Sequence, residues 1–178
     1  MQIPPHLDLS DVCWAIDLQE IKTSEQFAPE DAVDFNEVEY ETLLARLNDS
    51  SNTVNAQYTR GEARVIFTLQ VSRVARSEGD IYDIIIQRMT SKTPRCGHGT
   101  QAVLALVFIA AKMNPARGVH LQSTITEGSK ALGEKLKRDH GFTSDAQNSN
   151  YLSPPVGTCS AALLLDDGRI EHKLTEGC

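Results

Sequence analysis

Cysteines are few in this sequence, and they are scattered. Cys13, Cys96, Cys159 and Cys178 form no C-x-x-C pair and have no histidine at ligand spacing. Zinc sites need closely spaced ligand pairs, and disulfide frameworks need many cysteines in a short chain. We therefore expect no metal site, no dense disulfide framework and a reducing, cytoplasmic setting.

Clusters of basic residues are also absent, since 17 lysines and arginines stand against 24 acidic residues, a net charge of −7. Because nucleic-acid phosphates are bound by grouped Lys and Arg, we expect no nucleic-acid partner. An acidic chain instead favours cationic partners through electrostatic steering.

Long hydrophobic runs are missing too. The most apolar stretch, residues 102–111, is far shorter than the roughly 20 residues of a membrane-spanning helix. The first residues, MQIPPHLDLS, contain no basic segment followed by an apolar one, so we expect no signal peptide and no membrane partner. Length and composition predict a single globular domain over residues 1–178.

Hydrophobic periodicity predicts an α/β fold with a mixed, mostly antiparallel central sheet flanked by helices. Asn36 and Glu39 form a capping-box pattern at the start of the helix expected at residues 36–47. The acidic segment 23–35 has room for one short helix, and the isoleucines at 84–86 predict a central strand covered on both faces. Expected strands cover residues 11–18, 54–59, 64–73, 81–89, 119–125, 160–165 and 169–174, and expected helices cover residues 36–47, 99–113 and 128–139.

The segment PRCGHGT, residues 94–100, joins a strand to the most apolar helix. A helix start presents unpaired N–H groups and a partial positive charge, which together attract phosphate. Gly97 and Gly99 would let the backbone approach a phosphate without a Cβ in the way. The alternative is that the two glycines only turn the chain tightly.

Two motifs in this order resemble the GNAT superfamily of N-acetyltransferases. The family's phosphate loop, Q/R-x-x-G-x-G/A, is matched at Gly97 and Gly99, and its helix closing on a Gly-Phe pair is matched at Gly141-Phe142. The resemblance implies acetyl-CoA as co-substrate and direct transfer of its acetyl group to a primary amine. That amine would belong to a small cationic molecule or to a protein Lys or N-terminus, and a homodimer is compatible with the family.

The same resemblance implies the cofactor-binding residues. Backbone groups of Gln87 and Met89 would pair with the pantetheine arm. The pyrophosphate would be held by the backbone amides of Arg95, Cys96, Gly97, His98, Gly99 and Thr100.

Some positions depart from the family pattern. The leading Gln or Arg of the phosphate loop falls on Pro94, with Arg95 one place late. Lys137 stands where many members carry the tyrosine that protonates the leaving thiolate, and Lys130 replaces a frequent Asn. Cofactor binding survives this comparison better than catalysis does.

Catalysis therefore needs other residues. Asp83, in the central strand, is the candidate general base, and a surface carboxylate is the alternative. Tyr151 is the candidate acid for the thiolate, ahead of Tyr82, although buried tyrosines are usually core residues.

Two other functions are compatible with the sequence. Cys96, beside His98 at a helix N-terminus, could act as a cysteine nucleophile, but residues two apart seldom face each other and no orienting residue is evident. The missing tyrosine and displaced arginine would also suit a non-catalytic protein of this fold that binds CoA or a protein partner.

Overall fold

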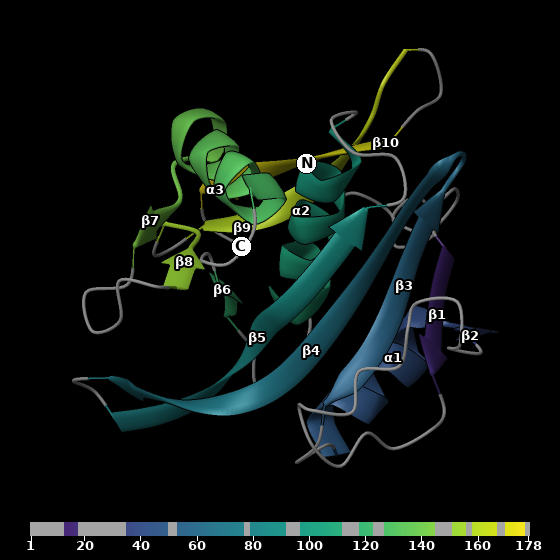
Figure 1. Ribbon diagram of the computed structural model, residues 1–178, viewed down its shortest axis with the longest axis horizontal. Coiled ribbons are helices and arrows are strands. Elements are labelled where there is room, and N and C mark those ends of the chain that lie inside the picture. The colour runs from purple at the N-terminus through teal and green to yellow at the C-terminus, as the bar shows by residue number, and fades with distance from the viewer. Residues whose placement is uncertain are drawn as a thin grey trace.

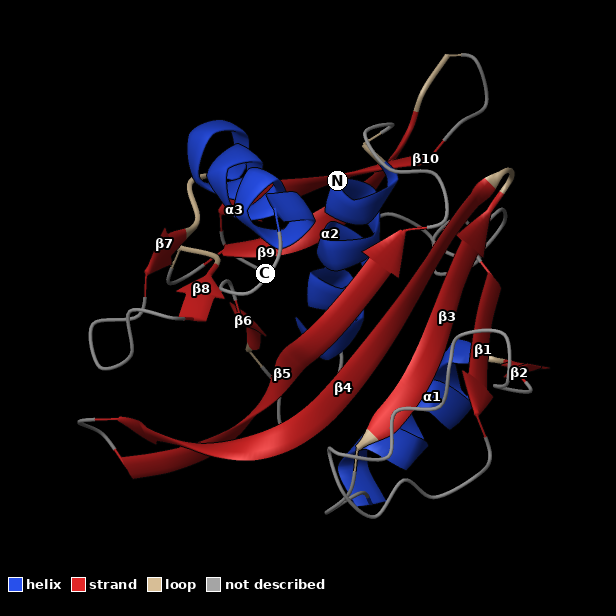
Figure 2. Ribbon diagram, in the orientation of Figure 1, coloured by secondary structure: helices blue, strands red, loops and turns tan. Residues whose placement is uncertain are grey.

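A large twisted β-sheet dominates the computed structural model, with helices packed against it (Figures 1 and 2). The structure describes residues 13–17, 35–49, 53–76, 79–91, 97–111, 118–122, 127–144, 151–155, 158–166 and 170–176.

Eight described strands form this sheet, in the order β2-β1-β3-β4-β5-β6-β8-β7. They are β1 (Cys13–Asp17), β2 (Phe35–Val38), β3 (Val54–Arg60), β4 (Ala63–Arg76), β5 (Gly79–Ser91), β6 (Val119–Gln122), β7 (Thr143–Ser144) and β8 (Tyr151–Ser153). Each neighbouring pair is antiparallel except β5 and β6, which run parallel. The expected mixed, mostly antiparallel sheet is confirmed.

Helix α2 (His98–Ala111) connects the parallel strands β5 and β6 and packs between two sheets. One is the large sheet, and the other is the hairpin of β9 (Thr158–Leu164) and β10 (Ile170–Glu176). The Gln101 side chain joins α2 to the hairpin, because it accepts a hydrogen bond from the His172 backbone N–H at 2.8 Å. Burial from both sides explains why α2 is apolar around most of its surface.

Helices α1 (Tyr40–Asp49) and α3 (Glu127–His140) each contact α2. Their apolar residues Leu43, Leu47 and Leu136 are fully buried and belong to the same hydrophobic cluster as α2. The core thus lies between the large sheet and these helices.

The two faces of the central strands carry different side chains. Ile84 and Ile86 on β5 belong to the core cluster shared with α2. Because side chains alternate along a strand, Asp83 and Ile85 face the opposite side of the sheet. All three isoleucines are buried, which confirms that this central strand is covered on both faces.

The predicted start of the first helix at Asn36 is wrong. Residues Phe35–Val38 form strand β2, and α1 begins at Tyr40 with the Glu39 carbonyl accepting its first backbone hydrogen bonds. Asn36 pairs with Ile16 of β1. Pairing with β1 therefore overrides the local capping signal, which the sequence alone could not reveal.

Other predicted elements agree with the structure to within a few residues. The helix expected at 128–139 is α3, and Gly141 follows it with a φ of 68°. The Phe142 N–H bonds back to the Leu136 carbonyl at 3.2 Å, so the predicted left-handed glycine cap is confirmed. The short helix considered for residues 23–35 lies, but for its last residue, outside the described residues.

Candidate functional site

Strands β5 and β6 pair over only a short length. Three register pairs join them, from Ile84–Val119 to Ile86–Leu121. Strand β6 ends at Gln122, whereas β5 continues to Ser91. In Figure 1 the last part of β5 runs on toward α2 with no described strand on its β6 side. Among the residues that the structure describes, no strand pairs with the β6-facing backbone edge of β5 beyond Ile86, and we call this end of the β5–β6 pair the opening.

A β-bulge interrupts β5 at this opening. Opposite β4, Ile86 pairs with Leu69 and Arg88 pairs with Thr68, so Gln87 is an extra residue between consecutive pairs. A bulge of this kind shifts the alternation of the strand by one position.

The shift turns the backbone of Met89 toward the opening. The Ile84 N–H donates to the Gly118 carbonyl at 2.9 Å, so the backbone groups of Ile84 and Ile86 face β6. In a regular strand the backbone groups of residue 88 would also face the β6 side. Because Gln87 is inserted, the backbone groups of Met89 face that side instead. This places Met89, one of the two residues expected to pair with a pantetheine arm, at the separated edge.

Gly97 lies at the entrance of α2 with a φ of 77°, a conformation that favours glycine. Its carbonyl accepts a hydrogen bond from the Gln101 N–H at 3.2 Å in the first helical turn. The N–H groups of His98, Gly99 and Thr100 stand at the positions that a helix leaves without partners inside itself. This is the geometry that favours an anion.

Lys135 of α3 lies at the entrance of α2, a position that was not predicted from the sequence. A Cβ on Gly97 would lie 3.5 Å from Lys135 Nζ, so the ammonium group sits against the entrance of α2. Lys135 is half-buried, and in the described part of the chain no carboxylate forms an ion pair with it. The leading Gln or Arg of the family's loop falls on Pro94, and the nearest basic residue, Arg95, is outside the described residues. Only the packing of α3 on α2 singles out Lys135 among the lysines of α3.

Gly99 has a packing role of its own. A Cβ on Gly99 would lie 2.9 Å from Met89 Cε and 3.9 Å from Leu132 Cδ1. The glycine therefore lets Met89 pack against the first turn of α2, a role that neither the phosphate-binding nor the tight-turn prediction named. Its contact with phosphate remains a prediction. Cys96 is outside the described residues, so the Cys96–His98 nucleophile is not tested.

Asp83 is buried, with an exposed fraction of 1%. The Gly118 N–H donates to Oδ1 at 2.7 Å, and His120 Nε2 lies 2.6 Å from Oδ2. A Cβ on Gly118 would lie only 2.8 Å from Oδ2, so glycine is what allows the carboxylate to approach the β6 backbone. With both oxygens engaged and the side chain enclosed, Asp83 is poorly placed to contact an amine directly.

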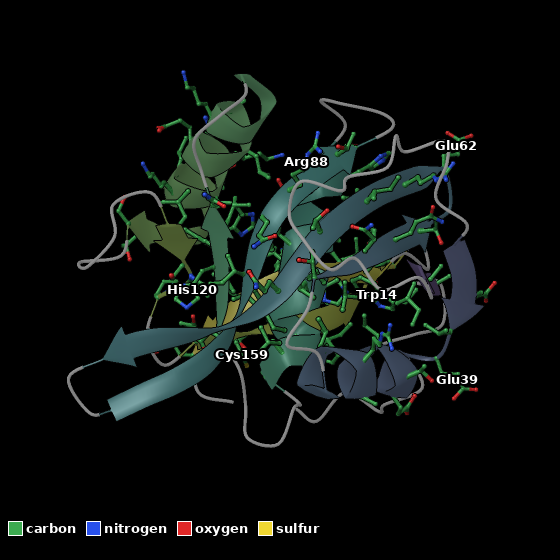
Figure 3. The ribbon with its side chains drawn as sticks, turned by 60° about the horizontal axis from the view of Figure 1, so that its bottom comes forward. Trp14, Glu39, Glu62, Arg88, His120 and Cys159 are labelled. Atoms are coloured by element: carbon green, nitrogen blue, oxygen red, sulfur yellow. The ribbon has the colours of Figure 1, made fainter. Side chains whose placement is uncertain are left out.

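His120 and Ser153 extend this contact across two more strands. His120 is 2% exposed, and its Nδ1 lies 2.6 Å from the Ser153 hydroxyl oxygen. Figure 3 shows His120 where β5, β6 and β8 meet. The sequence analysis missed both residues. The available signal was alternation, because a histidine between the apolar Val119 and Leu121 must face away from the core.

Tyr151 and Lys137, also discussed for catalysis, belong to different elements, β8 and α3. The backbone of Tyr151 pairs with Gln122, the last residue of β6, and its side chain is outside the described part. Lys137 is on the solvent side of α3, where it forms an exposed ion pair with Glu134 at 3.6 Å. The catalytic role of Tyr151 remains a prediction.

Cysteines and metal ligands add little to this site. Cys13 is free and exposed, whereas Cys159 of β9 is disulfide-bonded. Disulfides persist mainly in oxidising settings, so this bond counts against the expected reducing, cytoplasmic setting. Within the described ranges, the structure groups no three His, Cys, Asp or Glu side chains as metal ligands. No helix of the described part is long and apolar enough to span a membrane.

No protein-family model matches the chain, and no curated protein sequence matches it. Among solved structures, it is similar to a variant of the AtaT toxin in which a tyrosine is replaced by phenylalanine, bound to the C-terminus of the antitoxin AtaR and acetyl-CoA. The two chains are 18% identical, the match covers 82% of this chain and 93% of that one, and the TM-score is 0.46. A likeness of this size does not establish a family.

Proposed function

We propose that this chain is an acetyl-CoA-dependent N-acetyltransferase that moves an acetyl group to a primary amine by direct attack in a ternary complex. Residues 1–178 would act as a single acyltransferase-like domain. The observation that carries the proposal is the opening between β5 and β6, which leads to the N-terminus of α2. The resemblance to the GNAT superfamily, based on the loop and Gly-Phe motifs, assigns acetyl-CoA to such an opening.

The residues present fit this co-substrate. At the strand end, the backbone of Met89 would hydrogen-bond the pantetheine amides, with Gln87 at the bulge beside it. At the helix end, the amides that follow Gly97 would bind the pyrophosphate. Lys135 would supply a positive charge beside these amides, where the family's leading Gln or Arg is replaced by Pro94.

The acceptor is inferred from charge. A net charge of −7 and a phosphate site limited to one helix end favour a cationic amine over a nucleic acid. A polyamine, an aminoglycoside-like molecule and a protein Lys or N-terminus all satisfy this. Residues 23–35 and 146–158, which would shape the acceptor pocket, lie mostly outside the described residues.

A non-catalytic protein that binds CoA is the second candidate. It is favoured by Lys137, which forms a surface ion pair where an acid would be needed, and by the enclosure of Asp83. The two functions differ in one measurement. An enzyme releases the CoA thiol when an amine is added, whereas a binding module is stabilised by acetyl-CoA and releases none.

Calorimetric titration with acetyl-CoA tests the binding site. Lys135→Ala should weaken binding by about tenfold, since a hydrogen bond to a charged group contributes roughly 1.5–3 kcal/mol. Lys130→Ala removes an exposed lysine from the same helix and should leave the Kd within about twofold. Gly99→Val should also weaken binding, because the added side chain would overpack against Met89, whose Cε lies 2.9 Å from a Cβ at this position, and would disturb the first turn of α2. Absence of binding to the unsubstituted protein at millimolar acetyl-CoA would reject the proposal.

A further inference from the structure

We propose that Asp83, His120 and Ser153 form a proton relay, and that the Ser153 hydroxyl, rather than Asp83, takes the proton from the attacking amine. This inference rests on the proposed acetyltransferase function. It assigns to Ser153 and His120 a role that sequence reasoning gave to Asp83 alone.

Three adjacent strands place these side chains in one row. Ile85 of β5 is in register with His120 of β6, and Leu121 of β6 is in register with Leu152 of β8. Leu121 and Leu152 are core residues, so their neighbours His120 and Ser153 face the other side of the sheet. The row therefore lies on the face opposite α2.

The row also lies next to the point where β5 and β6 separate. Leu121 belongs to the last register pair, and His120 precedes it by one residue, about 3.3 Å of strand. A pantetheine arm along Met89 would end near this point, with its thioester toward the row. An acceptor approaching from the face opposite α2 would then meet Ser153, which is the half-buried end of the row.

The contacts set the direction of proton transfer. Asp83 Oδ2 lies 2.6 Å from His120 Nε2, and a carboxylate there favours the tautomer with the proton on Nε2. His120 Nδ1 is then an acceptor for the Ser153 hydroxyl, 2.6 Å away. Asp83 orients the ring and stabilises the imidazolium that forms, which makes it a positioning residue.

The step balances without a further reactant. The amine nitrogen forms a bond to the thioester carbonyl carbon, and its proton passes to Ser153 Oγ. At the same time the Ser153 hydroxyl proton passes to His120 Nδ1. The C–S bond breaks, CoA leaves as a thiolate that takes up a proton from water, and the imidazolium later returns its proton to water, so no net proton is gained or lost.

A covalent acetyl-serine fits the chain less well. Attack by a serine places negative charge on the carbonyl oxygen, and backbone N–H groups beside the nucleophile commonly stabilise it. The two residues after Ser153 are Pro154 and Pro155, which have no N–H. A hydroxyl that only passes a proton has no such requirement.

Variants of Ser153 test the relay with acetyl-CoA binding as a parallel readout. Thiol release would be measured with a polyamine, an aminoglycoside and a lysine peptide as acceptors, and the Kd of acetyl-CoA by calorimetry. Ser153→Ala should lower kcat by about tenfold to hundredfold at an unchanged Kd, because a positioned proton acceptor is lost. Ser153→Thr keeps the hydroxyl and should retain most activity. Ser144→Ala, an exposed serine on the adjoining strand β7, is the matched control and should change neither quantity.

Each other outcome rejects the relay in a recognisable way. Full activity of Ser153→Ala would overturn it and leave the proposed function standing. Acetyl-CoA binding without thiol release from any acceptor would reject both, and so would absence of binding. An acetyl group found on Ser153 by mass spectrometry would replace the relay with a covalent mechanism. Nitrogen NMR showing the proton of His120 on Nδ1 would reverse the assigned direction and overturn the relay.

Discussion

Replacing Gly118 with alanine should destabilise the protein, although the backbone at this position is not strained. Its φ is outside the left-handed region, so alanine meets no conformational penalty there. A Cβ would, however, lie 2.8 Å from Asp83 Oδ2, 3.0 Å from Cγ and 3.1 Å from Oδ1. The Asp83 carboxylate must therefore move, and its contacts with the Gly118 N–H and His120 lengthen.

The expected size follows from these contacts. Loss of a hydrogen bond to a charged group costs about 1.5–3 kcal/mol, and overpacking costs about 1–3 kcal/mol. Partial loss at two contacts gives an expected destabilisation of roughly 2–4 kcal/mol. For a chain of this length the midpoint of thermal unfolding should fall by about 5–15 °C. If the carboxylate could relax freely, Gly118→Ala would instead stabilise by about 0.4–1 kcal/mol through the unfolded state.

Urea denaturation of a double-mutant cycle provides the assay. In an Asp83→Ala background the added Cβ has room, so Gly118→Ala should become neutral or slightly stabilising. Gly61→Ala is the matched control, because Gly61 has a φ of 56° and nothing within 4 Å of a Cβ. Its cost, about 1–2 kcal/mol from backbone conformation, should not depend on Asp83. An equal cost of Gly118→Ala in both backgrounds would refute the reasoning.

The remaining predictions concern the acid for the leaving thiolate and the pH dependence of stability. Lys137→Ala should leave kcat almost unchanged, because this lysine is in an exposed ion pair. Tyr151→Phe should lower kcat by about tenfold to hundredfold, because a proton donor is lost. Steady-state kinetics measure both effects, and loss of activity in Lys137→Ala would contradict the assignment. Burial lowers the pKa of His140 in the folded protein below its ordinary 6.5. The unfolded chain therefore binds a proton at this histidine at a higher pH than the folded protein does. The free energy of unfolding should consequently fall as the pH drops below 6.5. Urea titrations at about pH 7 and about pH 5 should show a smaller fall for His140→Gln, and an identical fall would exclude this histidine as a cause.

Local sequence patterns predicted the elements whose signals depend only on the chain near them. The apolar helix α2, the glycine cap at Gly141 and the β9–β10 hairpin all belong to this group. Strand β2 was missed because its stability comes from pairing with β1, and a capping-box pattern at Asn36 predicted a helix there instead. Strands β7 and β8 are only two and three residues long, too short to show a periodicity.

The candidate site was predicted in its backbone parts and missed in its side-chain parts. The glycines that mark the entrance of α2 are visible as a motif, and Asp83 is visible as a carboxylate among isoleucines. Each of the missed residues is far in sequence from the residue that it meets. His120 is 37 positions from Asp83, and Ser153 is 33 positions from His120. Lys135 is 38 positions from Gly97. Which of them meet depends on the order and register of strands, and no local pattern encodes that.

The bulge at Gln87 explains how one strand can serve two sites. Before the bulge, β5 directs Asp83 to the face opposite α2 while its backbone pairs with β6. After the bulge, the Met89 side chain packs against α2 and its backbone turns toward the separated edge. A regular strand would have put the backbone of residue 88 at that edge and the Met89 side chain on the opposite face. One inserted residue therefore fixes the proposed co-substrate edge relative to the proposed relay, and both lie beside the same short parallel pairing.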